Sequence, residues 1–185
     1  GFDPAKIIFT PNSVGLEEYI EATQLKVNIN IDNLHILEAF GNQFGHSYPV
    51  IVRLNPHIMA GGNLKISTGH VDSKFGISID QVDQILSVVG RTNIHITGLH
   101  IHTGSEIKDI EVFVQGLKTV LELTKFFPEL SIIDLGGGFK VPYKPDEVGT
   151  DMEKLGVSLA YTLEEFEKTS GKKYEIWFEP GKFLV

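Results

Sequence analysis

Short runs of aliphatic and β-branched residues alternate along the chain with longer segments in which apolar residues recur every three or four positions. The short runs predict six strands, at residues 6–10, 27–31, 50–54, 95–102, 131–135 and 175–179. The longer segments predict helices, with apolar residues on one face, over 79–89, 110–121 and 152–166. Ser13 and Asp32 are candidate N-caps of two earlier helices. Strands that alternate with helices predict right-handed βα units and a parallel sheet.

Polar residues follow nearly every predicted strand at its carboxyl end. They are Asn12, Asp32, Arg53, Asn55, His102, Asp134 and Glu179. In an open, doubly wound sheet, ligand-binding groups gather on one or two strands at the switch point. A ring of polar groups over all strands is typical of the top of a (β/α)8 barrel. We therefore predict the α/β class and an incomplete TIM-type barrel, with six of the eight strands that this fold needs.

Composition narrows the classes of partner. The chain has 185 residues, of which 42% are hydrophobic, which suffices for one sizeable core. Its net charge of −8 argues against a nucleic acid or an anionic membrane as the ligand. No cysteine is present, so disulfides, thiolate catalysis and cysteine-ligated zinc are excluded for these residues. No apolar run reaches the roughly 20 residues of a membrane span.

Three glycines, Gly136, Gly137 and Gly138, come directly after the predicted strand 131–135. Residues without a Cβ allow a sharp turn and let several N–H groups approach one anion, often a phosphate. Two further glycine-containing polar segments, 98–105 and 178–182, also come at or after a strand end. We expect the three segments to form one site.

His100 and His102 are two residues apart on a strand, so both side chains point to the same face. With Asp134 and Glu179 they could ligate a metal, they could be buried structural histidines, or one ring could lie against an aromatic cofactor. Glu179 could be a capping carboxylate, or the partner of a pyridinium nitrogen. Ser105 and Lys182 are either solvated or additional donors to an anion.

Arg53 ends an apolar strand, where an unpaired charge is costly, so we expect it to pair with a carboxylate inside the barrel. The connection 55–78 is the one long loop, and loops of this length tend to be functional. Lys74, within this loop, is interpreted as a loop charge rather than a Schiff-base amine.

Seven short motifs occur in a fixed order, at residues 7–12, 30–33, 52–56, 73–76, 98–105, 134–139 and 179–182. Together they resemble the fold-type III, PLP-dependent amino-acid decarboxylases, over the whole of 1–185. The resemblance implies the alanine-racemase-like barrel domain and pyridoxal 5'-phosphate as cofactor. Within the family, the motifs are most similar to the branch that releases CO2 from meso-2,6-diaminopimelate to give L-lysine, a cytoplasmic reaction of amino-acid biosynthesis.

The resemblance also implies roles for individual residues. His102 would stack on the cofactor ring, while Ser105 and Gly136, Gly137 and Gly138 would hold its phosphate. Glu179 would bind the pyridine nitrogen and act with His102 in catalysis. The remaining residues implied at the cofactor are Pro180, Gly181, Lys182 and Arg53. Lys182 would also contact a substrate carboxylate, although the family usually has Arg there, whose bidentate fork Lys lacks.

Two parts that the family uses are not found in this sequence. The Schiff-base lysine lies on the family's first barrel strand, and the C-terminal β-domain carries a cysteine motif that reaches the active site of the neighbouring subunit. We therefore expect residues 1–185 to be a partial barrel domain of a homodimeric lyase, inactive by itself. Alternatives are an ornithine, arginine or carboxynorspermidine decarboxylase, a regulatory relative without catalysis, and a metal-dependent barrel hydrolase that uses His100 and His102.

Overall fold

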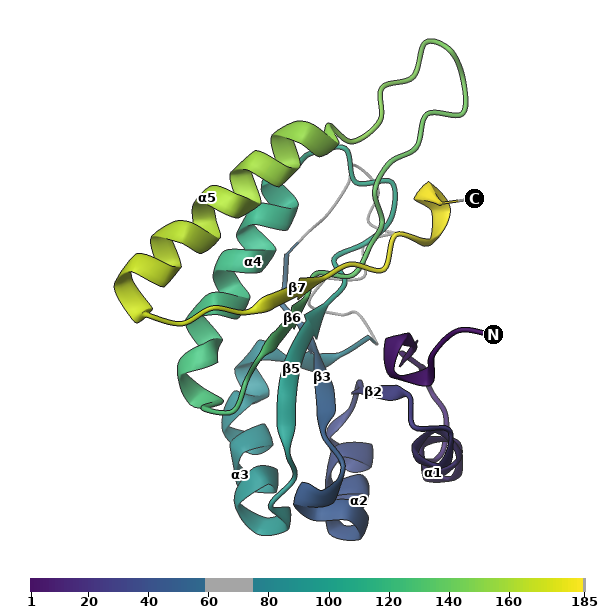
Figure 1. Ribbon diagram of the computed structural model, residues 1–185, viewed down its shortest axis with the longest axis vertical. Helices are drawn as coiled ribbons and strands as arrows, with labels where there is room; N and C mark the ends of the chain where they lie inside the picture. Colours follow the sequence, from purple (N-terminus) through teal and green to yellow (C-terminus); the bar gives the residue numbers. More distant parts are fainter. Residues whose placement is uncertain (59–74, 185) are drawn as a thin grey trace.

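The computed structural model describes residues 1–58 and 75–184, which form one curled parallel sheet with helices packed against it (Figure 1). The strands are β1 (Ile8–Phe9), β2 (Asn28–Ile31), β3 (Val50–Asn55), β4 (Ile77–Ser78), β5 (Ile96–Ile101), β6 (Ile132–Asp134) and β7 (Glu175–Trp177). Every pairing between them is parallel. The short β4 lies off the main row of strands and pairs with the end of β3.

The strand order distinguishes a barrel from an open sheet. Neighbours in the sheet follow the chain, β1-β2-β3-β5-β6-β7, with no reversal of direction along the row. A doubly wound sheet needs such a reversal, because its two halves grow outward from a central switch point. The sequential order and the curl are those of a half-barrel, as predicted.

Within the described residues, five α-helices connect the strands. They are α1 (Leu16–Leu25), α2 (Leu34–Phe44), α3 (Val82–Thr92), α4 (Glu111–Leu123) and α5 (Met152–Ser170). Figure 1 shows α4 and α5 side by side, and α2 packed against α3, with both chain ends on the side away from α4 and α5. None of the helices within 1–58 and 75–184 is long and apolar enough to cross a membrane.

The hydrophobic core lies between the sheet and these helices. All six residues of β3 are buried, as expected for a central strand covered on both faces. The largest fully buried aliphatic side chains come from both layers and include Ile29, Ile31, Leu37, Leu54, Ile85, Leu99, Leu117 and Ile133. This packing fixes the strands, and therefore the positions of the loops that follow them.

Both predicted N-caps are wrong. Helix α2 is capped by Asn33, whose Oδ1 accepts from the Ile36 N–H at 2.8 Å, while Asp32 stays buried at the end of the sheet. Helix α1 begins after Gly15, which provides no side-chain cap. Ser13 instead has a φ of 59° and donates to Asn12 Oδ1. In both cases the turn between strand and helix is longer than the sequence pattern indicated, so the helix begins later in the chain.

Candidate functional site

Four residues on neighbouring strands lie at one level of the sheet. Arg53 on β3 is in register with His100 on β5, His100 with Asp134 on β6, and Asp134 with Trp177 on β7. Side chains in register on parallel strands point to the same face. Arg53, His100 and Asp134 are all buried there, with relative exposures of 7%, 1% and 0%. The sheet therefore gathers three ionisable groups near its carboxyl edge.

The loops after β5, β6 and β7 touch one another through the three glycines. A Cβ on Gly138 would collide with the Gly104 carbonyl, and one on Gly137 would collide with the Glu179 carbonyl. A Cβ on Gly136 would lie 2.8 Å from His102 Nδ1. The structure therefore brings the three predicted segments together, and glycine is needed because the turn lies between two other backbones.

The glycine N–H groups have different partners. The Gly136 N–H donates to Asp134 Oδ1 at 2.8 Å, and the Gly137 N–H donates to His102 Nδ1 at 3.3 Å. Within the described residues, no partner accepts the Gly138 N–H. Two groups thus hold the turn to neighbouring side chains, and the third remains available to a ligand beside Ser105, whose Cα borders the same glycine.

The two histidines are neutral at pH 7. Burial, with Arg53 as a second cause, lowers the pKa of His102 to about 4. The same causes bring the pKa of the fully buried His100 well below its ordinary value. Because His102 Nδ1 accepts from Gly137, the ring proton of His102 is on Nε2. His102 therefore offers a flat, uncharged ring at the end of β5.

Two carboxyl groups meet beside these rings. Asp134 Oδ2 has no hydrogen-bond partner within the described residues and lies close to Glu179. Burial, and then the charge of Glu179, raise the pKa of Asp134 to about 8. Glu179 Oε1 is 3.5 Å from His100 Nε2 and accepts from Thr10 Oγ1 at 3.2 Å. Asp134 thus keeps its proton to a higher pH than an ordinary aspartate does.

Arg53 does not form the ion pair that was predicted. No carboxylate of the described residues lies within ion-pair distance of it; its guanidinium carbon is 5.0 Å from the centre of the Phe75 ring. Burial lowers the pKa of Arg53, and the charges of Asp32 and Glu179 oppose that effect from a longer distance. The cation–π contact and these two carboxylates together hold the buried charge.

Lys182 contacts a residue that the sequence did not single out. Its Nζ is 2.6 Å from Glu106 Oε1, in the loop that carries Ser105, and 5.9 Å from the centre of the Tyr143 ring. This hydrogen bond with Glu106 raises the pKa of Lys182. The ammonium thus links the loop after β7 to the loop after β5. Pro180 and Gly181 lie between Glu179 and Lys182, and Gly137 packs against Pro180.

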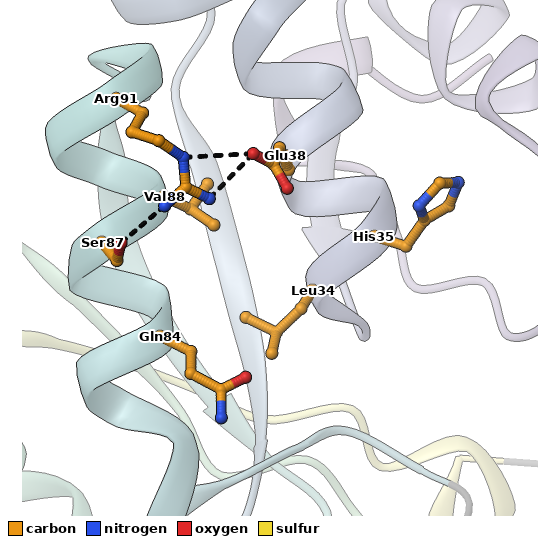
Figure 2. A pocket seen from close by; sticks show the side chains of 7 residues that line it. All are labelled: Leu34, His35, Glu38, Gln84, Ser87, Val88 and Arg91. Atoms are coloured by element: carbon orange, nitrogen blue, oxygen red, sulfur yellow. Dashed lines mark hydrogen bonds and ion pairs between the residues drawn. The ribbon is translucent and has the colours of Figure 1, made fainter.

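Two hollows of the surface differ in character. A cavity of about 470 Å³ is lined by Ile8 of the first strand, by Trp177 and Glu179 at the last strand, and by Asp134 of β6. A hollow of about 230 Å³ lies between α2 and α3, where Figure 2 shows Arg91 paired with Glu38 at 2.8 Å. The second contains none of the predicted site residues.

The metal interpretation is only partly matched by the geometry. His100, Asp134 and Glu179 place one possible ligand atom each within 4.8 Å of one another, but His102 does not join this group. Lys74 lies outside the described residues.

Sequence reasoning missed Thr10 and Asn30. Asn30 is buried on β2, and its two amide atoms have no hydrogen-bond partner within the described residues. The polar positions in the strand Asn28–Ile31 were a signal for Asn30.

Comparison with known proteins identifies the family. Residues 1–185 match the family model described as pyridoxal-dependent decarboxylase, pyridoxal binding domain. The chain belongs to this family. Its cofactor is therefore pyridoxal 5'-phosphate, and its fold is that of the family's barrel domain.

Individual relatives agree with this assignment. Diaminopimelate decarboxylase of Buchnera aphidicola is 28% identical over 187 residues, which are 100% of this chain and 44% of the relative. The crystal structure of diaminopimelate decarboxylase from M. jannaschii in complex with L-lysine is similar with a TM-score of 0.81 and 26% identity, over 98% of this chain and 44% of that chain. An arginine decarboxylase of Paramecium bursaria Chlorella virus (TM-score 0.76, 20% identity, 98% and 47% covered) shares the fold. The chain thus spans less than half the length of these relatives.

The described residues fit the cofactor. The Gly138 N–H can donate to a phosphate oxygen. The turn has no room for a Cβ at any of its three glycines. Glu179 lies at the end of β7 with a partly exposed carboxylate, while His102 presents a neutral ring at the end of β5. A phosphate donor, a flat ring and a carboxylate are groups that suit PLP, which also needs a Schiff-base lysine.

Proposed function

We propose that the protein containing this domain is a diaminopimelate decarboxylase, a carboxy-lyase that converts meso-2,6-diaminopimelate to L-lysine and CO2. The relatives that match the whole chain support this proposal by their name, and the M. jannaschii structure contains the product, L-lysine. The observation that carries it is the convergence of the loops after β5, β6 and β7 on the glycine turn. Those loops bear the residues that the resemblance to the family assigns to the PLP site.

In the proposed site, the phosphate is held by the Gly138 N–H and by Ser105. The turn of Gly136 and Gly137, fixed through Asp134 and His102, positions that donor. Pro180 borders the same turn from the other side, and the Gly181 N–H donates to the Glu179 carbonyl at 2.9 Å. His102 lies against the ring of the cofactor. Because its side chain is neutral, packing it against the ring removes no charge from water.

Glu179 is the proposed partner of the pyridine nitrogen. When bound, PLP supplies an electron sink that stabilises the negative charge left as CO2 departs. Glu179 keeps a proton on the ring nitrogen, since an anionic carboxylate favours the protonated form of a basic group beside it. Thr10 donates to Glu179 Oε1 and so holds this carboxylate in place. Arg53, which is buried on β3, is proposed to act on the bound cofactor through its positive charge.

Lys182 is proposed to bind a carboxylate of the substrate or the phosphate. Its ammonium is already paired with Glu106. An incoming anion would therefore either share the ammonium with Glu106 or replace Glu106 as its partner. As an ammonium rather than a guanidinium, it would attract the anion without the bidentate geometry of Arg. Cytoplasmic location and a homodimer with active sites shared between subunits are also proposed, from the resemblance to the family.

The test is a substrate panel on the full-length protein saturated with PLP. Release of CO2 is measured with meso-diaminopimelate, ornithine, arginine and carboxynorspermidine, and L-lysine is quantified as product. We expect meso-diaminopimelate to give the highest kcat/KM and one L-lysine per CO2. A higher kcat/KM with one of the other three would assign the protein to that branch of the family, and no CO2 with any substrate would favour a regulatory relative.

A further inference from the structure

A second cluster of ionisable side chains lies at the opposite edge of the sheet. His46 is in the 3-10 turn Gly45–Ser47 before β3, His95 directly precedes β5, and Glu129 is in the loop before β6. Since β3, β5 and β6 are consecutive neighbours, their entering segments lie side by side. The topology thus places three potential ligands on three separate segments at the amino ends of the strands.

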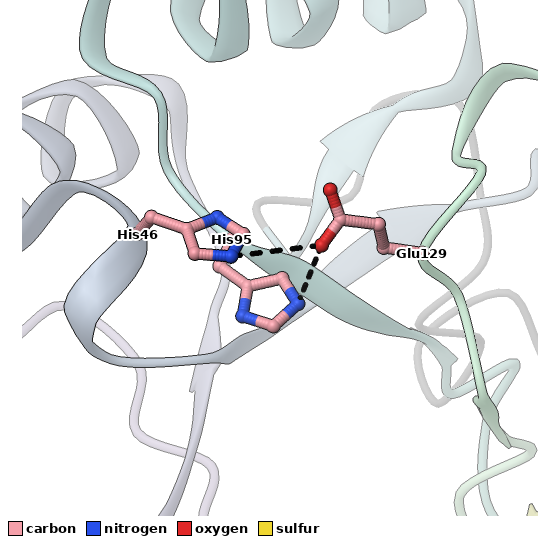
Figure 3. A group of neighbouring side chains, drawn as sticks. All are labelled: His46, His95 and Glu129. Carbon is pink, nitrogen blue, oxygen red and sulfur yellow. Dashed lines mark ion pairs between the residues drawn. The ribbon is translucent and has the colours of Figure 1, made fainter.

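The three side chains point to one place, as Figure 3 shows. Glu129 Oε2 is 3.0 Å from His95 Nε2 and 3.8 Å from His46 Nε2, and one ligand atom of each residue lies within 4.8 Å of the others. Tetrahedral zinc with ligands at about 2.0–2.2 Å separates neighbouring ligand atoms by roughly 3.3–3.5 Å. The two distances from Glu129 Oε2 bracket that value, so its carboxylate lies within coordination range of an ion shared with either ring.

The backbone around the cluster is fixed by the sheet. The Val50 N–H donates to the His95 carbonyl at 2.9 Å, which ties His95 to the start of β3. The Ser131 N–H donates to the Thr97 carbonyl at 2.9 Å, which ties the segment after Glu129 to β5. The His46 and His95 rings are stacked, with centroids 4.1 Å apart and an angle of 16°. The backbone therefore fixes where the ligands stand, whereas one ring must turn out of the stack before both Nε2 atoms can face one ion.

We propose that His46, His95 and Glu129 bind a divalent transition-metal ion of the zinc class. Imidazole and carboxylate ligands suit zinc, copper and nickel rather than calcium or magnesium. The side chains of His46 and Glu129 are 51% and 58% exposed, which leaves access from solvent and room for a water as fourth ligand. The ion would cross-link the segments that enter three neighbouring strands.

This site is separate from the proposed cofactor site and does not depend on it. His95 and His102 flank the two ends of β5 (Ile96–Ile101), so their backbones are roughly 23 Å apart at about 3.3 Å per residue. The competing interpretation is a surface ion pair between His95 and Glu129 with His46 stacked on it. Such a pair would bind no metal stoichiometrically, which gives the two interpretations different outcomes.

The test is a titration of the full-length, chelator-treated and PLP-saturated protein with Zn²⁺, followed by calorimetry. We expect one equivalent to bind, and His46→Ala, His95→Ala and Glu129→Gln each to weaken binding at least tenfold. His35→Ala, which removes an exposed histidine on α2 outside the cluster, should leave affinity unchanged. Because Glu129 is exposed, its amide variant should fold normally, and circular dichroism checks all the variants.

The second group of potential ligands provides the discriminating control. His100, Asp134 and Glu179 could also attract zinc, and Asp134→Asn removes one of these ligands without touching the proposed site. Zinc binding that is lost in Asp134→Asn and kept in His46→Ala would overturn the proposal. The absence of stoichiometric binding, or equal affinity in wild type and His95→Ala, would overturn it too. In the Co²⁺-loaded wild type, visible d–d bands that His95→Ala abolishes would support it.

Discussion

Thr10 Oγ1 donates a hydrogen bond of 3.2 Å to Glu179 Oε1, across 169 residues of sequence. Thr10 follows β1 and Glu179 follows β7, the two edge strands of the sheet. A flat or doubly wound sheet would keep these edges far apart, so this contact requires the sheet to curl. The curl has a functional consequence, because it brings the carboxylate proposed for the pyridine nitrogen over the interior of the half-barrel.

Glu179→Gln should separate cofactor binding from catalysis. The amide oxygen can still accept from Thr10, so the loop and PLP binding should persist. The neutral amide no longer favours a protonated ring nitrogen, and we expect kcat for decarboxylation to fall roughly 10²-fold or more. The measurement is steady-state kinetics together with PLP content by absorbance. Glu164→Gln, an exposed change on α5, is the control, and equal turnover in both variants would contradict the assigned role.

Gly137→Ala should weaken both the fold and cofactor binding. The added methyl group would collide with the Glu179 carbonyl, and we expect a loss of about 1–3 kcal/mol in the free energy of unfolding. Gly156→Ala is the matched control, because nothing lies within 4 Å of its Cβ on α5, and it should stabilise by about 0.5–1 kcal/mol. Urea denaturation and PLP titration measure both effects. If Gly137→Ala changed neither the free energy of unfolding nor PLP binding, the three loops would not be packed as described.

Asp134 should make stability depend on pH. Its pKa is raised from 3.8 to about 8, so over that range the folded chain holds a proton that the unfolded chain releases, and stability falls as pH rises. His102, with its pKa lowered from 6.5 to about 4, contributes the opposite slope below pH 6.5. The window from pH 6.5 to 8 therefore reports on Asp134.

In that window, the free energy of unfolding of the PLP-free protein should fall in wild type and change less in Asp134→Asn. The asparagine keeps an acceptor for the Gly136 N–H and resembles the protonated acid. Asp146→Asn, an exposed change, should retain the wild-type slope. Identical slopes in wild type and Asp134→Asn would show that Asp134 is ionised in the folded protein. Urea denaturation at pH 6.5 and at pH 8 measures this difference in the free energy of unfolding.

His102→Ala should reduce PLP affinity at least about tenfold, since it removes both the flat ring and the acceptor for the Gly137 N–H. His95→Ala is a suitable comparison, because it removes a histidine at the other end of the same strand. The dissociation constant for PLP, from absorbance titration, distinguishes the two. Similar losses in both variants would point to a general effect on the sheet rather than to a contact with the cofactor.

Much of the architecture could be predicted from the order of apolar and polar residues. Alternating strands and helices gave the parallel sheet, and polar residues at successive strand ends distinguished the barrel from an open sheet. The cap positions could not be predicted, because Asp32 and Asn33 are both good caps and only the length of β2 decides between them. Strand ends also differed: β7 stops at Trp177, before the predicted 179.

The contacts between distant segments were the hardest part of the site to predict. The glycine turn and the strand-end residues stood out locally, but the partner of Lys182 did not. Glu106 is 76 residues away and has no motif of its own. Arg53 illustrates a different difficulty, since a buried charge needs compensation, but an aromatic ring and two more distant carboxylates can provide it without an ion pair.

The most direct test of the central claim is a crystal structure of the full-length protein with PLP. We predict the phosphate within hydrogen-bond distance of the Gly138 N–H and of Ser105, the ring against His102, and the ring nitrogen at the Glu179 carboxylate. A phosphate bound at another edge of the sheet, or a ring nitrogen with no contact to Glu179, would contradict the account.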